Sequence, residues 1–264
     1  FEPMRVEEIG PIEMEVDGRE LRLGVEICED LWDHGYEVKV TDLLAERGAN
    51  LIVNISASPF YAGKRFERER LLREKATRNR VPIFYVNLVG GQDELVFDGN
   101  SAFSDHTGRI SAAARPFAED LIMMDISCHP VQEARKLDHE FATLAEDFDS
   151  ELALRLVKLG LSAASEEKPE VELPEPHSVE LSEEEEVYQA LVPGVRDYVR
   201  KNGFGKVVIG LSGGVDSSAV VAHASRYAAG LKTFTMGFEE KRYDERAYAK
   251  EICLLYTSDA ADEL

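Results

Sequence analysis

Apolar positions in the first half of the chain gather in short runs that are separated by charged stretches. These runs are rich in Val, Ile and Leu, as expected of strands that are covered on both faces. We predict strands at residues 21–27, 50–56, 82–90 and 120–126. Residues 101–110 have the pattern of a hairpin with its turn at residues 106–108.

The charged stretches between these runs predict helices. Residues 41–48 end in a glycine, which is typical of a helix stop. Residues 64–80 show a sparse apolar face at helical spacing, made by Phe66, Leu71, Leu72 and Ala76. The alternation of strands and helices, followed by a hairpin, predicts an α/β layered domain with a mixed sheet.

The pattern changes after about residue 160. Residues 161–186 are rich in Glu, Pro and Ser, which predicts a linker between a first domain at 1–160 and a second at 187–252. The second domain reads as an amphipathic helix and then a strand–helix–strand unit, at residues 187–205, 206–211, 219–230 and 232–238. In such a unit the loop after the first strand lies at the carboxyl edge of the sheet, where ligands bind.

Composition argues against three classes: nonspecific nucleic-acid-binding, membrane-spanning and disulfide-rich proteins. The 264 residues include 51 acidic and 30 basic side chains, giving a formal charge of −21, which argues against nonspecific nucleic-acid binding. No apolar run approaches the ~20 residues that span a bilayer, so we expect no membrane partner. Three cysteines are too few for a disulfide framework, and we expect a cytoplasmic location.

The segment "IGLSGGVDSS" (residues 209–218) predicts an anion site. Two glycines let the backbone approach a ligand, and the following helix presents free N–H groups. An acidic residue beside a phosphate suggests that Asp216 binds Mg²⁺. A plain turn with a helix cap is the alternative. The predicted ATP-binding residues are Gly210, Leu211, Ser212, Gly213, Gly214, Val215, Asp216 and Ser217.

A second candidate site lies at "VEICEDLW" (residues 25–32). Cys28 follows a predicted strand and is surrounded by carboxylates, which disfavour the thiolate, so it needs a base or cation from elsewhere to act as a nucleophile. Taken alone, Cys28 fits the role of a buried packing cysteine better than that of a nucleophile. Trp32 and Tyr36 either line a substrate pocket or pack in the core.

Both segments resemble known families. The loop is similar to the "SGGxDS" pyrophosphate loop of the ATP pyrophosphatases. The segment "GVEICEDLW", with residues 48–65 and 81–103, resembles the nitrilase superfamily and its Glu–Lys–Cys triad. Their order resembles the glutamine-dependent NAD⁺ synthetases over residues 1–225. The resemblance implies part of a nitrilase-like α-β-β-α sandwich, followed by the start of a Rossmann-like ATP-pyrophosphatase domain.

The resemblance also implies a chemistry. Cys28 would hydrolyse glutamine, with the backbone N–H of Glu29 at the oxyanion, and Ser58 and Lys64 would hold the substrate. A Ser-Pro turn and a solvated lysine are the alternatives for these two residues. ATP, Mg²⁺ and deamido-NAD⁺ would meet at the second site, and the ammonia would displace AMP. The intact family enzymes are homo-oligomers.

Two features depart from this family. No lysine precedes Cys28, so the triad Glu and Lys are not in this chain and we expect no glutaminase activity from it alone. Residues 231–252 resemble asparagine synthetase instead, and residues 253–264 read as a non-native tail. Three alternatives stay open: an asparagine-synthetase-like ligase, a nitrilase-type amidase with a regulatory nucleotide module, and a noncatalytic interaction fragment.

Overall fold

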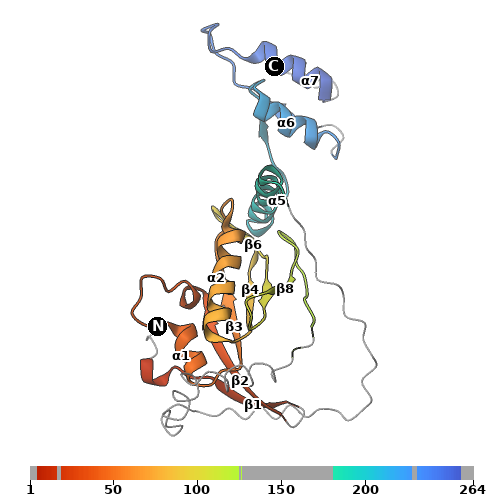
Figure 1. Ribbon diagram of the computed structural model, residues 1–264. Coiled ribbons are helices and arrows are strands. Elements are labelled where there is room, and N and C mark those ends of the chain that lie inside the picture. The colour runs from red at the N-terminus through yellow and green to blue at the C-terminus, as the bar shows by residue number, and fades with distance from the viewer. Residues whose placement is uncertain (1–4, 17–18, 125, 127–180, 228–230, 257–264) are drawn as a thin grey trace, which may run out of the picture. The chain divides into compact units, whose positions relative to one another are not determined.

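The computed structural model describes residues 5–16, 19–124, 126, 181–227 and 231–256 (Figure 1). The chain divides into two compact units, residues 1–198 and residues 199–264. The predicted linker at residues 161–186 lies mostly outside the described residues.

Unit 1 is built on a six-stranded mixed sheet with the order β1-β2-β3-β4-β7-β8. The three central strands are parallel, and each outer strand pairs antiparallel with its neighbour. The strands are β1 (Ile12–Val16), β2 (Arg19–Ile27), β3 (Leu51–Ser56), β4 (Ile83–Asn87), β7 (Ala102–Ser104) and β8 (Ile110–Ala113). The predicted mixed α/β sheet and the hairpin of β7 and β8 are confirmed.

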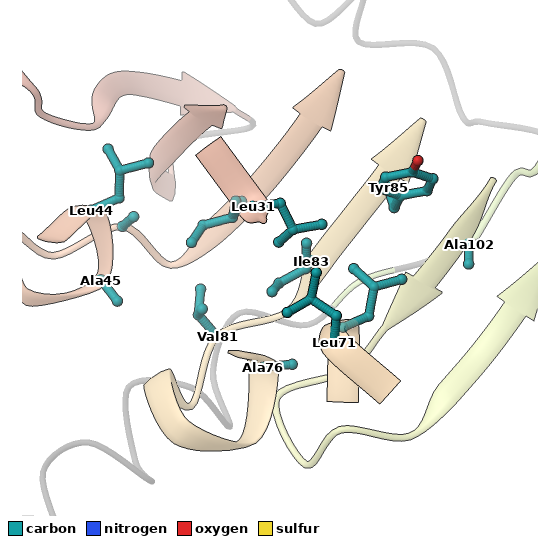
Figure 2. Close-up of a cluster of buried hydrophobic side chains, with 12 residues drawn as sticks. Leu31, Leu44, Ala45, Leu71, Ala76, Val81, Ile83, Tyr85 and Ala102 are labelled. Atoms are coloured by element: carbon teal, nitrogen blue, oxygen red, sulfur yellow. The ribbon is translucent and has the colours of Figure 1, made fainter. Parts of the chain in front are cut away.

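Helices α1 (Val40–Glu46) and α2 (Lys64–Asn79) connect the parallel strands and cover one face of the sheet (Figure 1). The main core fills the space between them and the strands, as Figure 2 shows. Its buried members are Leu31, Leu44, Ala45, Ala49, Ile52, Leu71, Leu72, Ala76, Val81, Ile83, Tyr85 and Ala102. The predicted apolar face of α2 is correct except for Phe66, which is 66% exposed.

Some elements differ from the sequence prediction. Strand β1 and the two-stranded ribbon of β5 (Val89–Gln92) and β6 (Leu95–Asp98) were not predicted. The strand predicted at residues 120–126 is wrong, since the described residues of that segment form none. Its alternate side chains Ile122, Met124 and Ile126 nevertheless pack against a second cluster at Leu51, Phe103 and Ala112. The alternating pattern therefore reflects burial of one side without a hydrogen-bonded ladder.

Helix α5 (Glu183–Lys201) begins inside the segment that the sequence assigned to the linker. Its start is a capping box, in which the N–H of Glu185 donates to Ser182 Oγ (3.3 Å) and the N–H of Ser182 donates to Glu185 Oε2 (3.0 Å). Four glutamates in the first turn also favour this start, because they lie at the positive end of the helix dipole. These local effects outweigh the low apolar content of the segment.

Residues 183–198 of α5 belong to unit 1 and pack on the rest of it at two glycines. The backbone N–H of Gly63 donates to Glu186 Oε2 (3.2 Å), and that of Gly91 donates to Asp197 Oδ2 (2.8 Å). A Cβ atom on Gly91 would lie 2.9 Å from Gly194 Cα, closer than real Cβ contacts allow. The ribbon of β5 and β6 thus meets the helix backbone directly.

Unit 2 contains a strand–loop–helix arrangement, as predicted. Strands β9 (Ile209–Gly210) and β10 (Thr233–Phe234) pair in parallel, and are shorter than predicted. Helix α6 (Val215–Ala224) begins within the glycine loop, four residues before its predicted start, and α7 (Arg246–Tyr256) ends the described chain. Leu211, Val221 and Ala249 form the small core of this unit. No helix in the described part of the chain is long and apolar enough to cross a membrane.

The contact at Gly91 gives a test of the packing of α5. Gly91→Ala should lower the free energy of unfolding by about 1–3 kcal/mol, because the added methyl group overlaps the helix backbone. Amide hydrogen exchange over residues 183–198 should become faster in this variant. Gly35→Ala is the matched control, since a Cβ there meets nothing within 4 Å. Unchanged exchange in α5 of Gly91→Ala would contradict the described contact.

Candidate active site

The candidate nucleophile lies at a constrained turn. Cys28 directly follows β2 and opens a one-turn 3-10 helix, η2 (Cys28–Leu31), with φ of 45°. This left-handed conformation costs a residue with a side chain about 1–2 kcal/mol. The turn is held because the N–H of Ile27 donates to Asp30 Oδ2 (2.8 Å) and the N–H of Trp32 donates to the Glu29 carbonyl (2.9 Å). Asp30 is therefore a structural cap of this turn.

Lys64 lies at the first position of α2 and points its ammonium at two aromatic rings. Nζ is 3.8 Å from the centroid of the Trp32 ring and 4.8 Å from that of Tyr61. Burial lowers the pKa of Lys64, and the nearby carboxylates of Glu67 and Glu29 act in the opposite direction. The position of Lys64 differs from the fully solvated alternative that its sequence context also allowed.

Ser58 is buried at the carboxyl end of β3, with 4% of its surface exposed. Its backbone N–H donates to Asn87 Oδ1 (2.9 Å) at the end of the neighbouring strand β4. Cys28, Ser58 and Asn87 thus follow or end three adjacent parallel strands, which places them at the same edge of the sheet. Their roles as nucleophile and glutamine-binding residues stay predictions.

A buried ion pair supports this edge, and no local feature of the sequence predicts it. The guanidinium of Arg68 donates to both carboxylate oxygens of Asp98, at 3.0 and 3.1 Å. Asp98 also accepts from Asn87 Nδ2 (3.2 Å) and Asn100 Nδ2 (2.6 Å). Burial lowers the pKa of Arg68, but the hydrogen bonds and the charge of Asp98, with Tyr85, outweigh it, so that the pKa is raised. Arg68 lies in a stretch of charged residues whose side chains are mostly exposed. Only its pairing with Asp98 distinguishes it from these neighbours.

Glu26 is a second buried ionisable residue that the sequence analysis missed. Its side chain is fully buried beneath the nucleophile turn, and Oε2 accepts from Asn54 Nδ2 (3.3 Å). Burial raises the pKa of Glu26 to about 7, against smaller opposing effects of Thr41, Asn54 and Lys75. Lys75 is paired with Asp33 at 2.5 Å, so its charge is shared with another carboxylate.

An open cleft of about 510 Å³ lies beside the nucleophile turn. Four of its lining residues are acidic: Glu29, Asp30, Asp33 and Glu37. Neither Cys28 nor Lys64 lines it. This cleft is therefore distinct from the predicted substrate position over Lys64.

The glycine loop of unit 2 lies directly before a helix, and its role in binding ATP stays a prediction. Gly213 has φ of 87°, and Gly214 is the residue before the first turn of α6. The hydroxyls of Ser212 and Ser217 lie 3.0 Å apart, and Ser212 Oγ accepts from the N–H of Gly214 (3.2 Å). The loop is thus preorganised by its own serines at the start of a helix.

The other predicted ATP-binding residues lie in the strand before this loop and in the helix after it. Leu211 is buried and pairs with the carbonyl of Phe234 through its N–H (2.8 Å), which anchors the loop to the neighbouring strand. Gly210 ends β9, whereas Val215 and Asp216 are exposed in the first turn of α6. No group of three or more His, Cys, Asp or Glu side chains suited to a metal occurs among the described residues.

The two halves of the chain match two different protein families. The family model described as carbon-nitrogen hydrolase matches residues 3–136, which contain the sheet and the nucleophile turn. The chain belongs to the carbon-nitrogen hydrolase family. The model described as asparagine synthase matches residues 189–260, which contain the glycine loop. The resemblance to an amidase family fused to an ATP-pyrophosphatase-like region is therefore confirmed.

Curated relatives of this carbon-nitrogen hydrolase chain share both halves. It is 39% identical over 218 residues to the glutamine-dependent NAD⁺ synthetase of Aquifex aeolicus, covering 81% of this chain and 35% of the relative. It is 40% identical over 206 residues to that of Thermotoga maritima, covering 78% and 34%. The chain thus spans about a third of the length of the curated relatives it matches.

Solved structures that match this chain include two enzymes with the same name as these relatives. The glutamine-dependent NAD⁺ synthetase of Acinetobacter baumannii in complex with ADP matches with a TM-score of 0.60 and 28% identity, over 93% of this chain and 39% of the other. The corresponding enzyme of Cytophaga hutchinsonii matches with a TM-score of 0.50 and 25% identity, over 82% and 26%.

The Arg68–Asp98 pair predicts a large effect on stability. Asp98→Ala should lower the free energy of unfolding by about 3–5 kcal/mol, because it leaves a buried guanidinium without its partner. Glu74→Ala removes an exposed i,i+4 pair with Arg70 on the same helix and should cost less than about 1 kcal/mol. Urea unfolding of both variants measures the difference. Equal effects would mean that the buried pair is not a main support of unit 1.

Glu26 predicts a dependence of stability on pH. The folded state keeps the proton of Glu26 up to about pH 7, whereas the unfolded chain releases it near the ordinary value of 4.5. The free energy of unfolding should therefore fall by about 3 kcal/mol between these pH values. Glu26→Gln carries no such proton, so its stability relative to the native chain should rise across this range.

Urea unfolding at pH 5 and pH 8, followed by the fluorescence of Trp32, measures this difference. Trp32 is the only tryptophan in the chain and lies in unit 1. Glu74→Gln, an exposed substitution on α2, should keep the native pH dependence. A constant offset between Glu26→Gln and the native chain at both pH values would disprove the raised pKa of Glu26.

Proposed function

We propose that this chain is part of an enzyme that amidates deamido-NAD⁺ to NAD⁺, using ATP and ammonia from glutamine. The observation that carries the proposal is the presence of both candidate sites, each within its own family match, in one chain. A cysteine turn of the carbon-nitrogen hydrolase family precedes a glycine loop, in an order shared with relatives named glutamine-dependent NAD⁺ synthetase over about four-fifths of this chain.

The first step takes place at the nucleophile turn. Cys28 Sγ forms a bond to the side-chain amide carbon of glutamine, and ammonia leaves once the amide nitrogen has gained a proton. Water then hydrolyses the thioester, which gives glutamate and the free thiol. The N–H of Glu29 is the proposed oxyanion donor, and Ser58 and Lys64 are the proposed substrate-binding residues.

The second step takes place at the glycine loop. The nicotinate carboxylate of deamido-NAD⁺ attacks the α-phosphorus of ATP, pyrophosphate leaves, and ammonia then displaces AMP. Residues 210–217 are proposed to hold the phosphates through N–H and hydroxyl donors. Asp216 is exposed at this loop, and one carboxylate with phosphate oxygens suits Mg²⁺, which would neutralise the phosphate charge. A cytoplasmic homo-oligomer is proposed by the same resemblance.

A second candidate is supported by one observation. The asparagine synthase model covers the glycine loop and everything described after it, so an aspartate side chain is an alternative acceptor. In that case AMP would form with aspartate and not with deamido-NAD⁺. The length of the similarity favours deamido-NAD⁺, because relatives named glutamine-dependent NAD⁺ synthetase match about four-fifths of this chain.

The test uses the full-length protein encoded by the gene, with AMP and NAD⁺ formation measured with either glutamine or ammonia. Cys28→Ala should lower glutamine-dependent synthesis by at least about 10³-fold and leave ammonia-dependent synthesis unchanged, because it removes only the nucleophile. Asp216→Ala should lower both. Cys253→Ala, in α7, is the matched control. Glutamine-dependent synthesis that survives Cys28→Ala would refute the nucleophile assignment.

A further inference from the structure

Among the described residues, the ammonium of Lys64 contacts two aromatic rings and no carboxylate. Nζ lies over the Trp32 and Tyr61 rings, and in the described part of the chain it makes no hydrogen bond or ion pair. Lys39 and Lys75, by contrast, are both paired with Asp33. Since an ammonium has three N–H donors, all three donors of Lys64 remain for a ligand. A partly buried ammonium with its three donors unused is suited to bind an anionic group of a ligand.

The aromatic support of Lys64 is part of the nucleophile turn. Trp32 directly follows η2, and its N–H closes that turn on the carbonyl of Glu29 at 2.9 Å. The ring that contacts Lys64 is therefore tied to the same short turn that opens with Cys28. Tyr61 is fixed separately, because its hydroxyl donates to Glu67 at 2.5 Å.

We propose that Trp32 is a positioning residue that holds the Lys64 ammonium for the α-carboxylate of glutamine. The proposal rests on the glutaminase function proposed above, and the α-carboxylate is the one anionic group of that substrate. A lysine side chain has four rotatable stem bonds, so an ammonium without support occupies many positions. A ring face at 3.8 Å reduces this freedom and attracts the charge. Trp32 thereby sets the position of the cation relative to Cys28.

Glutamine kinetics in the full-length protein test this role. Trp32→Leu should raise the KM for glutamine about tenfold, because it removes the ring face. The kcat with glutamine should change less than KM, and ammonia-dependent synthesis should stay unchanged. Trp32→Phe keeps a ring and should retain most of the affinity. Phe66→Leu, an exposed aromatic position on α2, is the matched control with no expected effect.

A double mutant separates positioning from general packing. If Trp32 acts through Lys64, the Trp32→Leu/Lys64→Met variant should have the same KM for glutamine as Lys64→Met alone. A Trp32→Leu substitution that raises KM equally in both backgrounds would overturn the proposal. Trp32→Phe with the KM of Trp32→Leu would overturn it as well.

Fluorescence distinguishes failure of this proposal from failure of the proposed function. Trp32 is the only tryptophan, so its emission reports the ammonium directly. Emission should titrate with a midpoint below the ordinary lysine pKa of 10.5, and Lys64→Met should abolish that titration. Emission that is the same in both proteins would overturn the contact itself. A native protein that shows the titration and uses ammonia but not glutamine would instead overturn the glutaminase function, and the substrate assigned to Lys64 with it.

Discussion

The buried pair of Arg68 and Asp98 is the interaction on which the arrangement of unit 1 depends. It joins α2 to the end of β6, and through Asn87 it reaches the backbone of Ser58. Lys64 begins the helix that carries Arg68, so the same pair fixes the direction from which the ammonium approaches the sheet edge. A charge buried at this point is costly without its partner, which makes the geometry of the edge strongly specified.

The sequence was sufficient for the parallel strands, because their apolar runs are long and are separated by clear helix signals. It also predicted that Cys28 follows a strand and that the glycine loop precedes a helix, because both stand in short distinctive segments. Their catalytic and ATP-binding roles stay predictions. The sequence was insufficient for β5, since two of its four residues are glycines. It was also insufficient for β6, whose apolar run has only three residues. The failure at residues 120–126 has another cause, because alternation records which side is buried and does not record backbone pairing.

The supporting residues of the site could not be recognised without the fold. Arg68 and Lys75 occur in a helix with many charges, and nothing local separates them from their exposed neighbours. Glu26 appears as one of several acids around Cys28, although it is buried and Asp30 caps the turn. The difference between a solvated charge and a buried one depends on partners that are distant in the sequence.

The contact of α5 with two glycines bears on how this architecture can be divided. The asparagine synthase match begins at residue 189, yet the helix up to Tyr198 belongs to unit 1 by its contacts. The border between the family matches and the border between the packed units therefore fall at different residues. A recombination point placed at the family border would separate Gly194 from Gly91. If halves are exchanged between relatives, Gly91 and Gly194 must both be kept. The two modules are therefore less independent in structure than in sequence.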